Sequence, residues 1–260
     1  MTWAFKRQLI YFGILVIFLV VFGYLISYPY LHKAPTCFDS KQNGDEEGID
    51  CGGSCFRECL SKVDEVSVLW ARSFKVIPGR YNALAYLENQ NSNTAVNKIH
   101  YRFRFADKDN VYIGTREGEA FIPPSRKFAI FEPAIDVGNS IPVHTSFTFT
   151  EVPLWLQVSE DKVNELKVFA GDITLEDENT SPRLSATVKN DSFFIIPDMN
   201  VVAILYDASG NALAVSQTYI EVMQAGESKE VHFTWPEPIM GQVVFKEIIP
   251  LYNIFWVKLK

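Results

Sequence analysis

Four cysteines, the residues of this chain with the most definite chemistry, lie within a single stretch of 23 residues. In an exported chain, thiols in even number usually form disulfides, each worth ~2–4 kcal/mol. The spacing leaves all three pairings open. A zinc site is the alternative, but the stretch lacks two clean Cys-x2-Cys knuckles. The cysteines are Cys37, Cys51, Cys55 and Cys59.

Acidic residues fill the interval between the first two cysteines. If Asp39 is position 1 of a twelve-residue loop, Gly44 is position 6 and Asp50 is position 12. This spacing is similar to that of EF-hand calcium loops, in which Gly at position 6 makes the sharp turn, although Lys41 at position 3 departs from it. Two interpretations of this loop stay open: a Ca²⁺ site, with Ca²⁺ as a cofactor, or a solvated acidic turn. The candidate ligands are Asp39, Asn43, Asp45, Glu47 and Asp50.

A second polar feature is a basic stripe along one predicted strand. Apolar residues at positions 99, 101, 103 and 105 alternate with basic ones, which predicts a half-buried strand with one polar face. This face is either a site for an anionic cell-wall polymer or acidic partner, or a solvated face neutralised by cross-strand acids such as Glu117 or Glu119. The stripe comprises Lys98, His100, Arg102 and Arg104.

We find no sequence motif for catalysis. None of the four histidines lies in a known catalytic motif, and no nucleophile elbow, metalloprotease motif or phosphate-binding glycine loop is present. We therefore expect a protein that is not an enzyme. The formal net charge of −7 also argues against binding nucleic acid.

These groups follow a long apolar segment. The eighteen residues Leu9–Ile26 carry no charge, and with their flanks they can cross a hydrocarbon core of roughly 30 Å. Lys6 and Arg7 precede this segment, so the positive-inside rule places residues 1–8 in the cytoplasm, 9–28 in the membrane and the rest outside. The alternative is a cleaved secretory signal, and both interpretations export residues 34–260.

The remaining chain contains an internal repeat. Leu87–Asn89 matches Val188–Asn190 at an offset of 101 residues, and the same offset aligns Phe103–Phe105 with Ile204–Tyr206. The repeat predicts tandem domains, since two copies are too few for a solenoid.

Later in the chain the offset changes. Phe147–Glu151 matches Phe233–Glu237 at an offset of 86, so we expect an insertion in the first copy near residues 121–142. Decoration of the core by an extra edge strand is one role for it, and a partner-binding flap is the other.

Short strands with turn signals between them predict a mainly β protein. We expect a cysteine-rich acidic segment at residues 34–60, followed by two immunoglobulin-like β-sandwiches at 61–153 and 154–260. Ser159–Leu166 is the one stretch between the copies that favours a short helical turn.

Two resemblances to known families support this plan. Leu205-Tyr206-Asp207, Ala225-Gly226-Glu227 and Phe233 resemble the FxLYD-type domain of bacterial and archaeal envelope proteins, over about residues 170–250. That likeness implies a non-catalytic sandwich. The cysteine segment, with Asn43-Gly44-Asp45-Glu46 and Asp50-Cys51-Gly52-Gly53, resembles a motif of bacterial surface proteins and implies an exported module.

The functional expectation is a single-pass envelope protein that displays two non-catalytic β-sandwich modules for binding or scaffolding. Its partners are then the membrane and an envelope protein or anionic cell-wall polymer. The alternative is an accessory subunit of a larger envelope assembly of secretion or pilus type.

Overall fold

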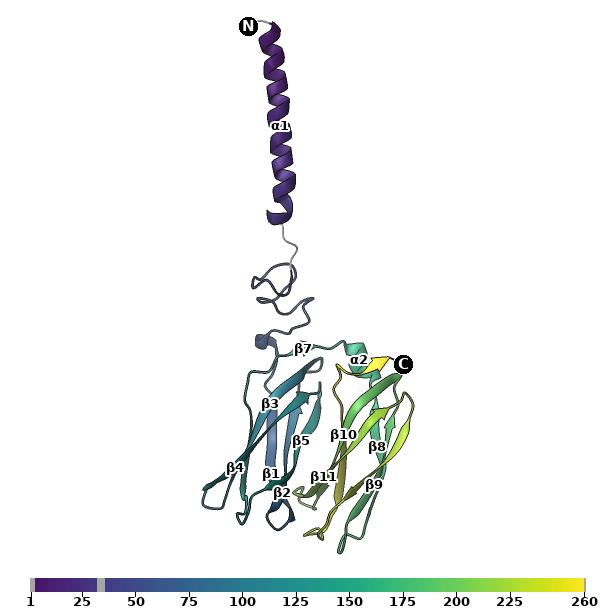
Figure 1. Cartoon of the computed structure of the whole chain (residues 1–260). Coiled ribbons are helices and arrows are strands. Elements are labelled where there is room, and N and C mark those ends of the chain that lie inside the picture. Colours follow the sequence, from purple (N-terminus) through teal and green to yellow (C-terminus); the bar gives the residue numbers. More distant parts are fainter. Residues whose placement is uncertain (1–2, 32–35, 260) are drawn as a thin grey trace. The chain divides into compact units, whose positions relative to one another are not determined.

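The computed structural model describes residues 3–31 and 36–259, and the chain divides into two compact units (Figure 1). The first unit ends at Cys55 and the second begins at Phe56, inside the predicted segment 34–60. The protein is mainly β, as predicted. Residues 1 and 2 of the predicted cytoplasmic tail, residues 34 and 35 of the cysteine segment, and Lys260 lie outside the described residues.

The first unit begins with helix α1, Trp3–Leu31, which contains the whole predicted span 9–28. Its central 24 residues, Phe5–Tyr28, have a mean hydropathy of 2.8 and none of them is buried. Apolar side chains surround this helix rather than forming one stripe, which is typical of a helix solvated by lipid. Length and composition suit a membrane anchor or a signal sequence.

The first sandwich consists of two antiparallel sheets, preceded by a short 3₁₀ turn, Leu60–Lys62. In the first sheet, β2 (Arg80–Asn89) lies between β1 (Ser67–Ile77) and β5 (Arg126–Asp136). In the second, β3 (Thr94–Ala106) lies between β4 (Tyr112–Ile122) and β6 (His144–Phe149), and β7 (Leu156–Gln157) pairs with the start of β3.

The second sandwich repeats this arrangement. In its first sheet, β9 (Arg183–Asn190) lies between β8 (Val168–Glu176) and β12 (Ser228–Thr234). In the second, β10 (Phe194–Tyr206) lies between β11 (Ala212–Met223) and β13 (Phe245–Leu251), and β14 (Lys258–Leu259) pairs with the start of β10. The common strand order confirms the tandem repeat.

A short helix, α2 (Glu160–Glu165), connects the two sandwiches. The Ser159 hydroxyl accepts a hydrogen bond of 3.3 Å from the backbone N–H of Lys162, which satisfies one of the free donors of the first turn. The predicted helical turn between the copies is therefore confirmed. The boundary predicted between residues 153 and 154 falls in the connection between β6 and β7.

The structure corrects the second part of the repeat. β5 pairs with β2 just as β12 pairs with β9, so residues 126–136 form a regular strand of the sandwich and not an insertion. Phe147 lies in β6, whereas Phe233 lies in β12, and these strands hold different places in their sandwiches. The match at an offset of 86 was wrong, because half-buried strands that alternate Phe with Thr look alike wherever they lie in a sheet.

Two buried asparagines show how the copies align. The side-chain N–H groups of Asn89 and Asn190 each donate to the carbonyl of the first residue of the following strand, at 3.1 Å and 2.7 Å. The turn after Asn89 is one residue longer, so β3 and β10, each of 13 residues, align at an offset of 100 instead of 101. Asp107 and Asp207 then hold the same turn position, where each accepts bonds from two backbone N–H groups.

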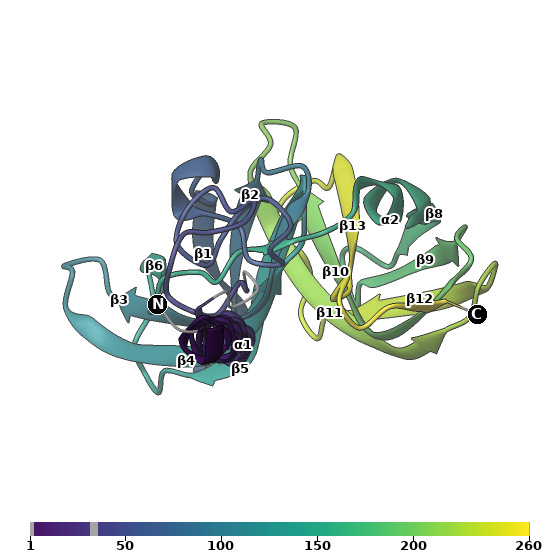
Figure 2. The ribbon, with the colours of Figure 1, turned by 90° about the horizontal axis from the view of Figure 1, so that it is seen from above.

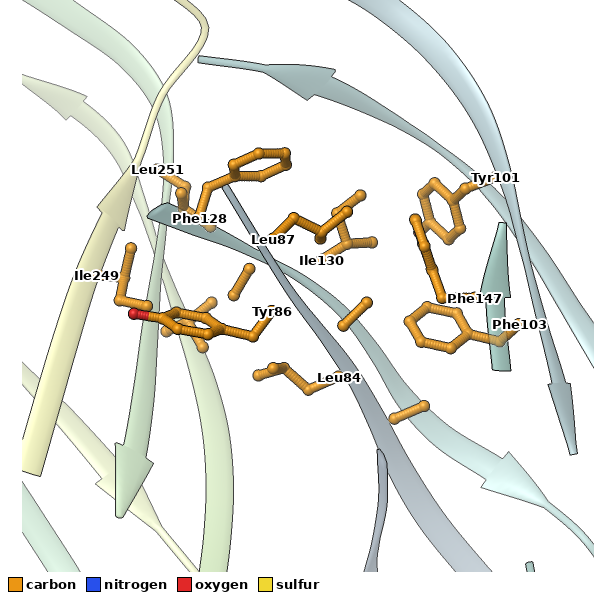
Figure 3. Packing of buried hydrophobic residues seen from close by; sticks show 14 of the residues in the cluster. Leu84, Tyr86, Leu87, Tyr101, Phe103, Phe128, Ile130, Phe147, Ile249 and Leu251 are labelled. Atoms are coloured by element: carbon orange, nitrogen blue, oxygen red, sulfur yellow. The ribbon is translucent and has the colours of Figure 1, made fainter. Parts of the chain in front are cut away.

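The two sandwiches lie side by side (Figure 2), and buried apolar side chains from both pack against each other (Figure 3). Along β10, Val201 and Leu205 point into the core of the second sandwich, whereas Val202 and Ile204 pack against the first. A fully buried aliphatic side chain contributes about 1.5–3 kcal/mol, so this face holds the sandwiches together as one unit. The second sandwich contributes Val202, Ile204, Val215, Ile249 and Leu251 to it.

Candidate functional site

The four cysteines are oxidised, as predicted. Cys37 is joined to Cys55, and Cys51 and Cys59 are also disulfide-bonded. No cysteine in the described part of the chain is free, which removes the thiolates that a zinc site needs. The bonds cross-link a segment that has little apolar core of its own.

Hydrogen bonds to the loop's own backbone occupy the carboxylates at positions 1 and 12 of the acidic loop. The Asp50 carboxylate accepts from the backbone N–H groups of Asp39 and Ser40, at 3.0 Å each. Asp39 in turn accepts from the N–H of Lys41 at 3.0 Å and from the side-chain amide of Asn43 at 2.8 Å. These bonds link the two ends of the loop to each other.

The structure does not gather the predicted calcium ligands into one acidic cluster. Among the described residues, the only group of three His, Cys, Asp or Glu ligand atoms within 4.8 Å joins Glu46 to the sulfurs of Cys37 and Cys55. Those sulfurs form a disulfide, so they are not thiolate ligands. Asp45 accepts from the Ser54 hydroxyl at 2.8 Å. The calcium site stays a prediction.

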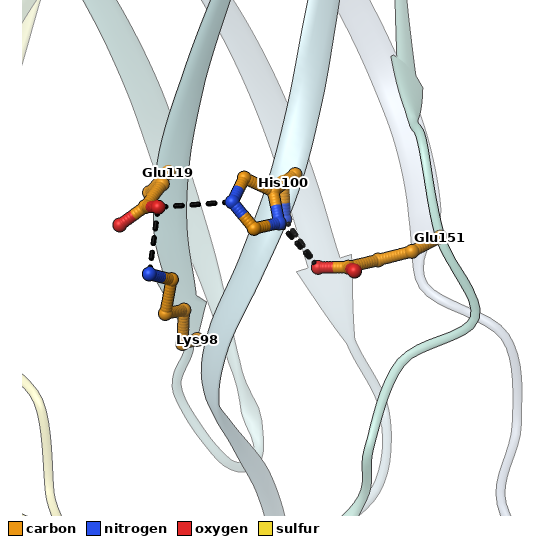
Figure 4. Close-up of polar contacts among 4 residues, drawn as sticks. All are labelled: Lys98, His100, Glu119 and Glu151. Atoms are coloured by element: carbon orange, nitrogen blue, oxygen red, sulfur yellow. Dashed lines mark hydrogen bonds and ion pairs between the residues drawn. The ribbon is translucent and has the colours of Figure 1, made fainter.

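The basic stripe lies on the outer face of β3 and faces acidic residues (Figure 4). Lys98 Nζ is 2.6 Å from Glu119, and Arg102 Nε is 2.6 Å from Glu117. Arg104 lies over the ring of Tyr112 at 5.6 Å. Pairs exposed to this degree contribute about 0–1 kcal/mol. The cross-strand acids therefore offset the charge that would attract an anionic polymer.

His100, at the centre of the stripe, contacts two carboxylates. Its Nδ1 is 2.7 Å from Glu151 and its Nε2 is 2.9 Å from Glu119. The hydrogen bonds to Glu151 and then Glu119 raise the pKa of His100 above its ordinary 6.5. Glu151 was missed by sequence reasoning, because it follows β6 and only the register of β6 on β3 brings it close to His100.

The same face of the second sandwich is apolar. With β3 and β10 aligned end to end, Arg102 and Arg104 correspond to Val202 and Ile204. The arginines are exposed, whereas both aliphatic residues have an exposed fraction of 0%. One sandwich therefore keeps its outer sheet face in solvent, and the other uses that face to bind its neighbour.

Polar contacts surround the apolar interface between the sandwiches. Glu247 of β13 accepts hydrogen bonds from the hydroxyls of Tyr86, at 2.7 Å, and Tyr206, at 2.8 Å. Burial and the bond to this carboxylate raise the pKa of both phenols. The C-terminal tail also packs here, since the Asn253 side chain donates to the backbone carbonyl of Asn97 at 3.0 Å.

In the described part of the chain, residues of both sandwiches line two clefts. The larger, of about 750 Å³, is lined by β1 and β11, and Lys75 and Glu237 form an ion pair of 2.9 Å beside it. The smaller, of about 380 Å³, is lined by parts of β3, β4, β5, β10, β11 and the C-terminal tail. Neither was foreseen, because each is made from segments of both copies.

The comparisons with known proteins do not assign the chain to a family. No family model matches the chain, and no curated protein matches it. Among solved structures, a red sea bream transglutaminase is 7% identical with a TM-score of 0.25, over 74% of this chain and 31% of its own length. Vicilin from Capsicum annuum is 8% identical with a TM-score of 0.17, over 71% of this chain and 78% of its own.

Proposed function

We propose that this chain is a single-pass membrane protein that displays a rigid pair of β-sandwiches on the extracytoplasmic side as a non-catalytic binding or scaffolding module. The observation that carries the proposal is the helix α1. Its 24 central residues have a mean hydropathy of 2.8, and none of them is buried by protein. In water this surface has a large cost, whereas a bilayer solvates it.

The oxidised cysteines support the proposal that the cysteine segment and the sandwiches lie on the extracytoplasmic side. Disulfides persist in oxidising compartments and are rare in the cytosol of mesophiles. Lys6 and Arg7 lie at the other end of the helix, where the positive-inside rule places the cytoplasm.

The interface supports a role for the two sandwiches together. Relative motion of domains is the default where an interface is small and polar. Here β10 is buried on both faces. A fixed pair of sandwiches presents sites that neither one contains alone.

The membership of the second sandwich among FxLYD-type envelope domains is part of this proposal. Its motif residues have structural roles: Asp207 accepts bonds from the turn after β10, and Tyr206 donates to Glu247. The turn at residues 225 and 226 precedes β12, with Gly226 at a φ of 74° that favours glycine.

Carbonate extraction with intact-mass analysis tests the anchor. The whole chain should stay in the membrane pellet at the mass of the uncleaved sequence. Release into the supernatant, or a mass lacking the first thirty or so residues, would replace the anchor by a cleaved signal. A detergent pull-down that returns a stoichiometric envelope partner would favour the accessory-subunit alternative.

A further inference from the structure

The smaller cleft between the sandwiches has the composition of a ligand site. Its volume of about 380 Å³ lies in the range of small-molecule pockets. Aromatic side chains line it from both copies and from the tail, including Phe121, Phe131, Tyr219 and Trp256. Tyr219 and Trp256 are 53% and 48% exposed, so a ligand in the cleft can reach them.

Planar polar side chains lie among these rings. Gln217 Nε2 donates to Asn200 Oδ1 at 3.2 Å. The side-chain N–H groups of Asn253 donate to the backbone carbonyl and to the side-chain Oδ1 of Asn97. An amide offers two N–H donors and two acceptor lone pairs, so one internal bond leaves further capacity at Gln217, Asn200 and Asn97. These groups are available to a ligand that both donates and accepts hydrogen bonds.

One wall of the cleft is held by local contacts. Asp198 has a φ of 51°, in the left-handed region that Asp tolerates better than most residues. Its carboxylate accepts a hydrogen bond from the hydroxyl of Tyr219. The bond ties the exposed ring of β11 to β10 and reduces the side-chain freedom that binding would otherwise remove.

The charges around the cleft argue against an anionic ligand. Lys98 is the one cation among the described residues of the lining, and Glu119 lies 2.6 Å from its ammonium group. Asp198 adds a further negative charge. A purely apolar ligand also fits poorly, because it would leave the amides without partners.

We propose that this cleft binds a neutral oligosaccharide. Sugar rings carry apolar faces that pack on aromatic side chains, and their hydroxyls both donate and accept hydrogen bonds, as the side chains of Gln217, Asn200 and Asn97 require. Trp256 provides one packing surface and Gln217 one polar contact. The inference rests on the proposed role as a binding module, and it names the chemical class of the ligand.

Tryptophan fluorescence of the full chain in nanodiscs tests the proposal, since sugar-headed detergents would compete. Titration with chitotetraose and cellotetraose should give a saturable change for at least one of them. Gln217→Ala should weaken the affinity about fivefold to tenfold, as expected for one or two lost hydrogen bonds. Trp256→Ala should abolish binding measured by calorimetry. Met240→Ala, at an 87% exposed residue of the larger cleft, is the matched control and should bind normally.

Several results would overturn the proposal. These are no saturable response to either oligosaccharide at millimolar concentration, equal weakening by Met240→Ala, or normal binding in both cleft variants. Saturable binding of an oligogalacturonate or a tripeptide in place of the neutral sugars would also overturn it. Carbonate extraction tests the membrane anchor in a separate measurement, so failure of the anchor and failure of sugar binding can be told apart.

Discussion

The hydroxyl of Tyr86 in the first sandwich donates a hydrogen bond of 2.7 Å to the carboxylate of Glu247 in the second. Tyr206 of the second sandwich donates to the other oxygen of the same carboxylate. We expect Glu247→Ala to lower the free energy of unfolding by about 2–4 kcal/mol, because two half-buried hydroxyls lose their acceptor. Chemical denaturation measures the loss. Glu230→Gln, at an exposed residue of β12, should change stability by less than about 0.5 kcal/mol.

The same contact predicts the response to alkali. The pKa values of Tyr86 and Tyr206 are raised above 10.0 in the folded protein. Their contribution to stability is therefore complete below pH 10 and is lost as the pH rises further, where the unfolded state releases its phenolic protons first. Ultraviolet titration should show these phenols ionising only as the protein unfolds. Ionisation of every tyrosine near pH 10 in the folded state would contradict the interface.

The equivalent positions Ile204 and Arg104 allow a matched test of the interface. Ile204 is fully buried against the first sandwich, whereas Arg104 is exposed on β3. We expect Ile204→Arg to cost roughly 3–5 kcal/mol, because it buries an unpaired charge. Arg104→Ile should be nearly neutral. If the two substitutions lowered the melting temperature equally, the sandwiches would not share a buried interface at Ile204.

Gly118 of β4 is expected to be intolerant of any side chain. A Cβ there would lie 2.5 Å from the hydroxyl of Tyr101 and 2.7 Å from the carboxylate of Glu132, which are hydrogen-bonded to each other and buried. Gly118→Ala should destabilise the protein by about 1–3 kcal/mol through overpacking. Gly114→Ala is the control on the same strand, where nothing lies within 4 Å of the added carbon. The prediction would be contradicted if both variants had the melting temperature of the wild type.

Many of the helices and strands could be predicted from residue patterns in the sequence. The alternation at residues 98–105 predicted a strand with one solvated face, and β3 has that face. The short helical turn predicted at Ser159–Leu166 was also foreseen, because it depends on a local hydrogen bond at its start. Helix α1 follows from an apolar run alone.

The interface and the clefts depend on contacts between distant segments. The consecutive apolar residues Val201–Leu205 carried the one local signal, since a strand buried on both faces reads as a continuous apolar run. The strand β5 was misassigned as an insertion, because sequence similarity alone paired β6 with β12. The contact of His100 with Glu151 depends on the register of β6, which no local pattern specifies.

His100 predicts a measurable pH dependence. Its pKa is raised by Glu151 and Glu119, so the stability that its protonated ring contributes is present below pH 6.5 and is lost as the pH rises through the higher folded value. Nuclear magnetic resonance should give a pKa above 6.5 for His100 and a lower one in Glu151→Gln. Glu165→Gln, at an exposed residue of α2, should leave the value unchanged. A pKa at or below 6.5 in the wild type would contradict the geometry.

The membrane topology is tested most directly by labelling with a membrane-impermeant maleimide on intact spheroplasts. All four native cysteines are disulfide-bonded, so a cysteine placed at Ser209, in the exposed turn after β10, is the reporter. We predict that Ser209→Cys is labelled as completely before lysis as after it, and that Gln8→Cys is labelled only after lysis. Labelling of Ser209→Cys only after lysis, or of the native cysteines without reduction, would contradict an anchored, oxidised, extracytoplasmic pair of sandwiches.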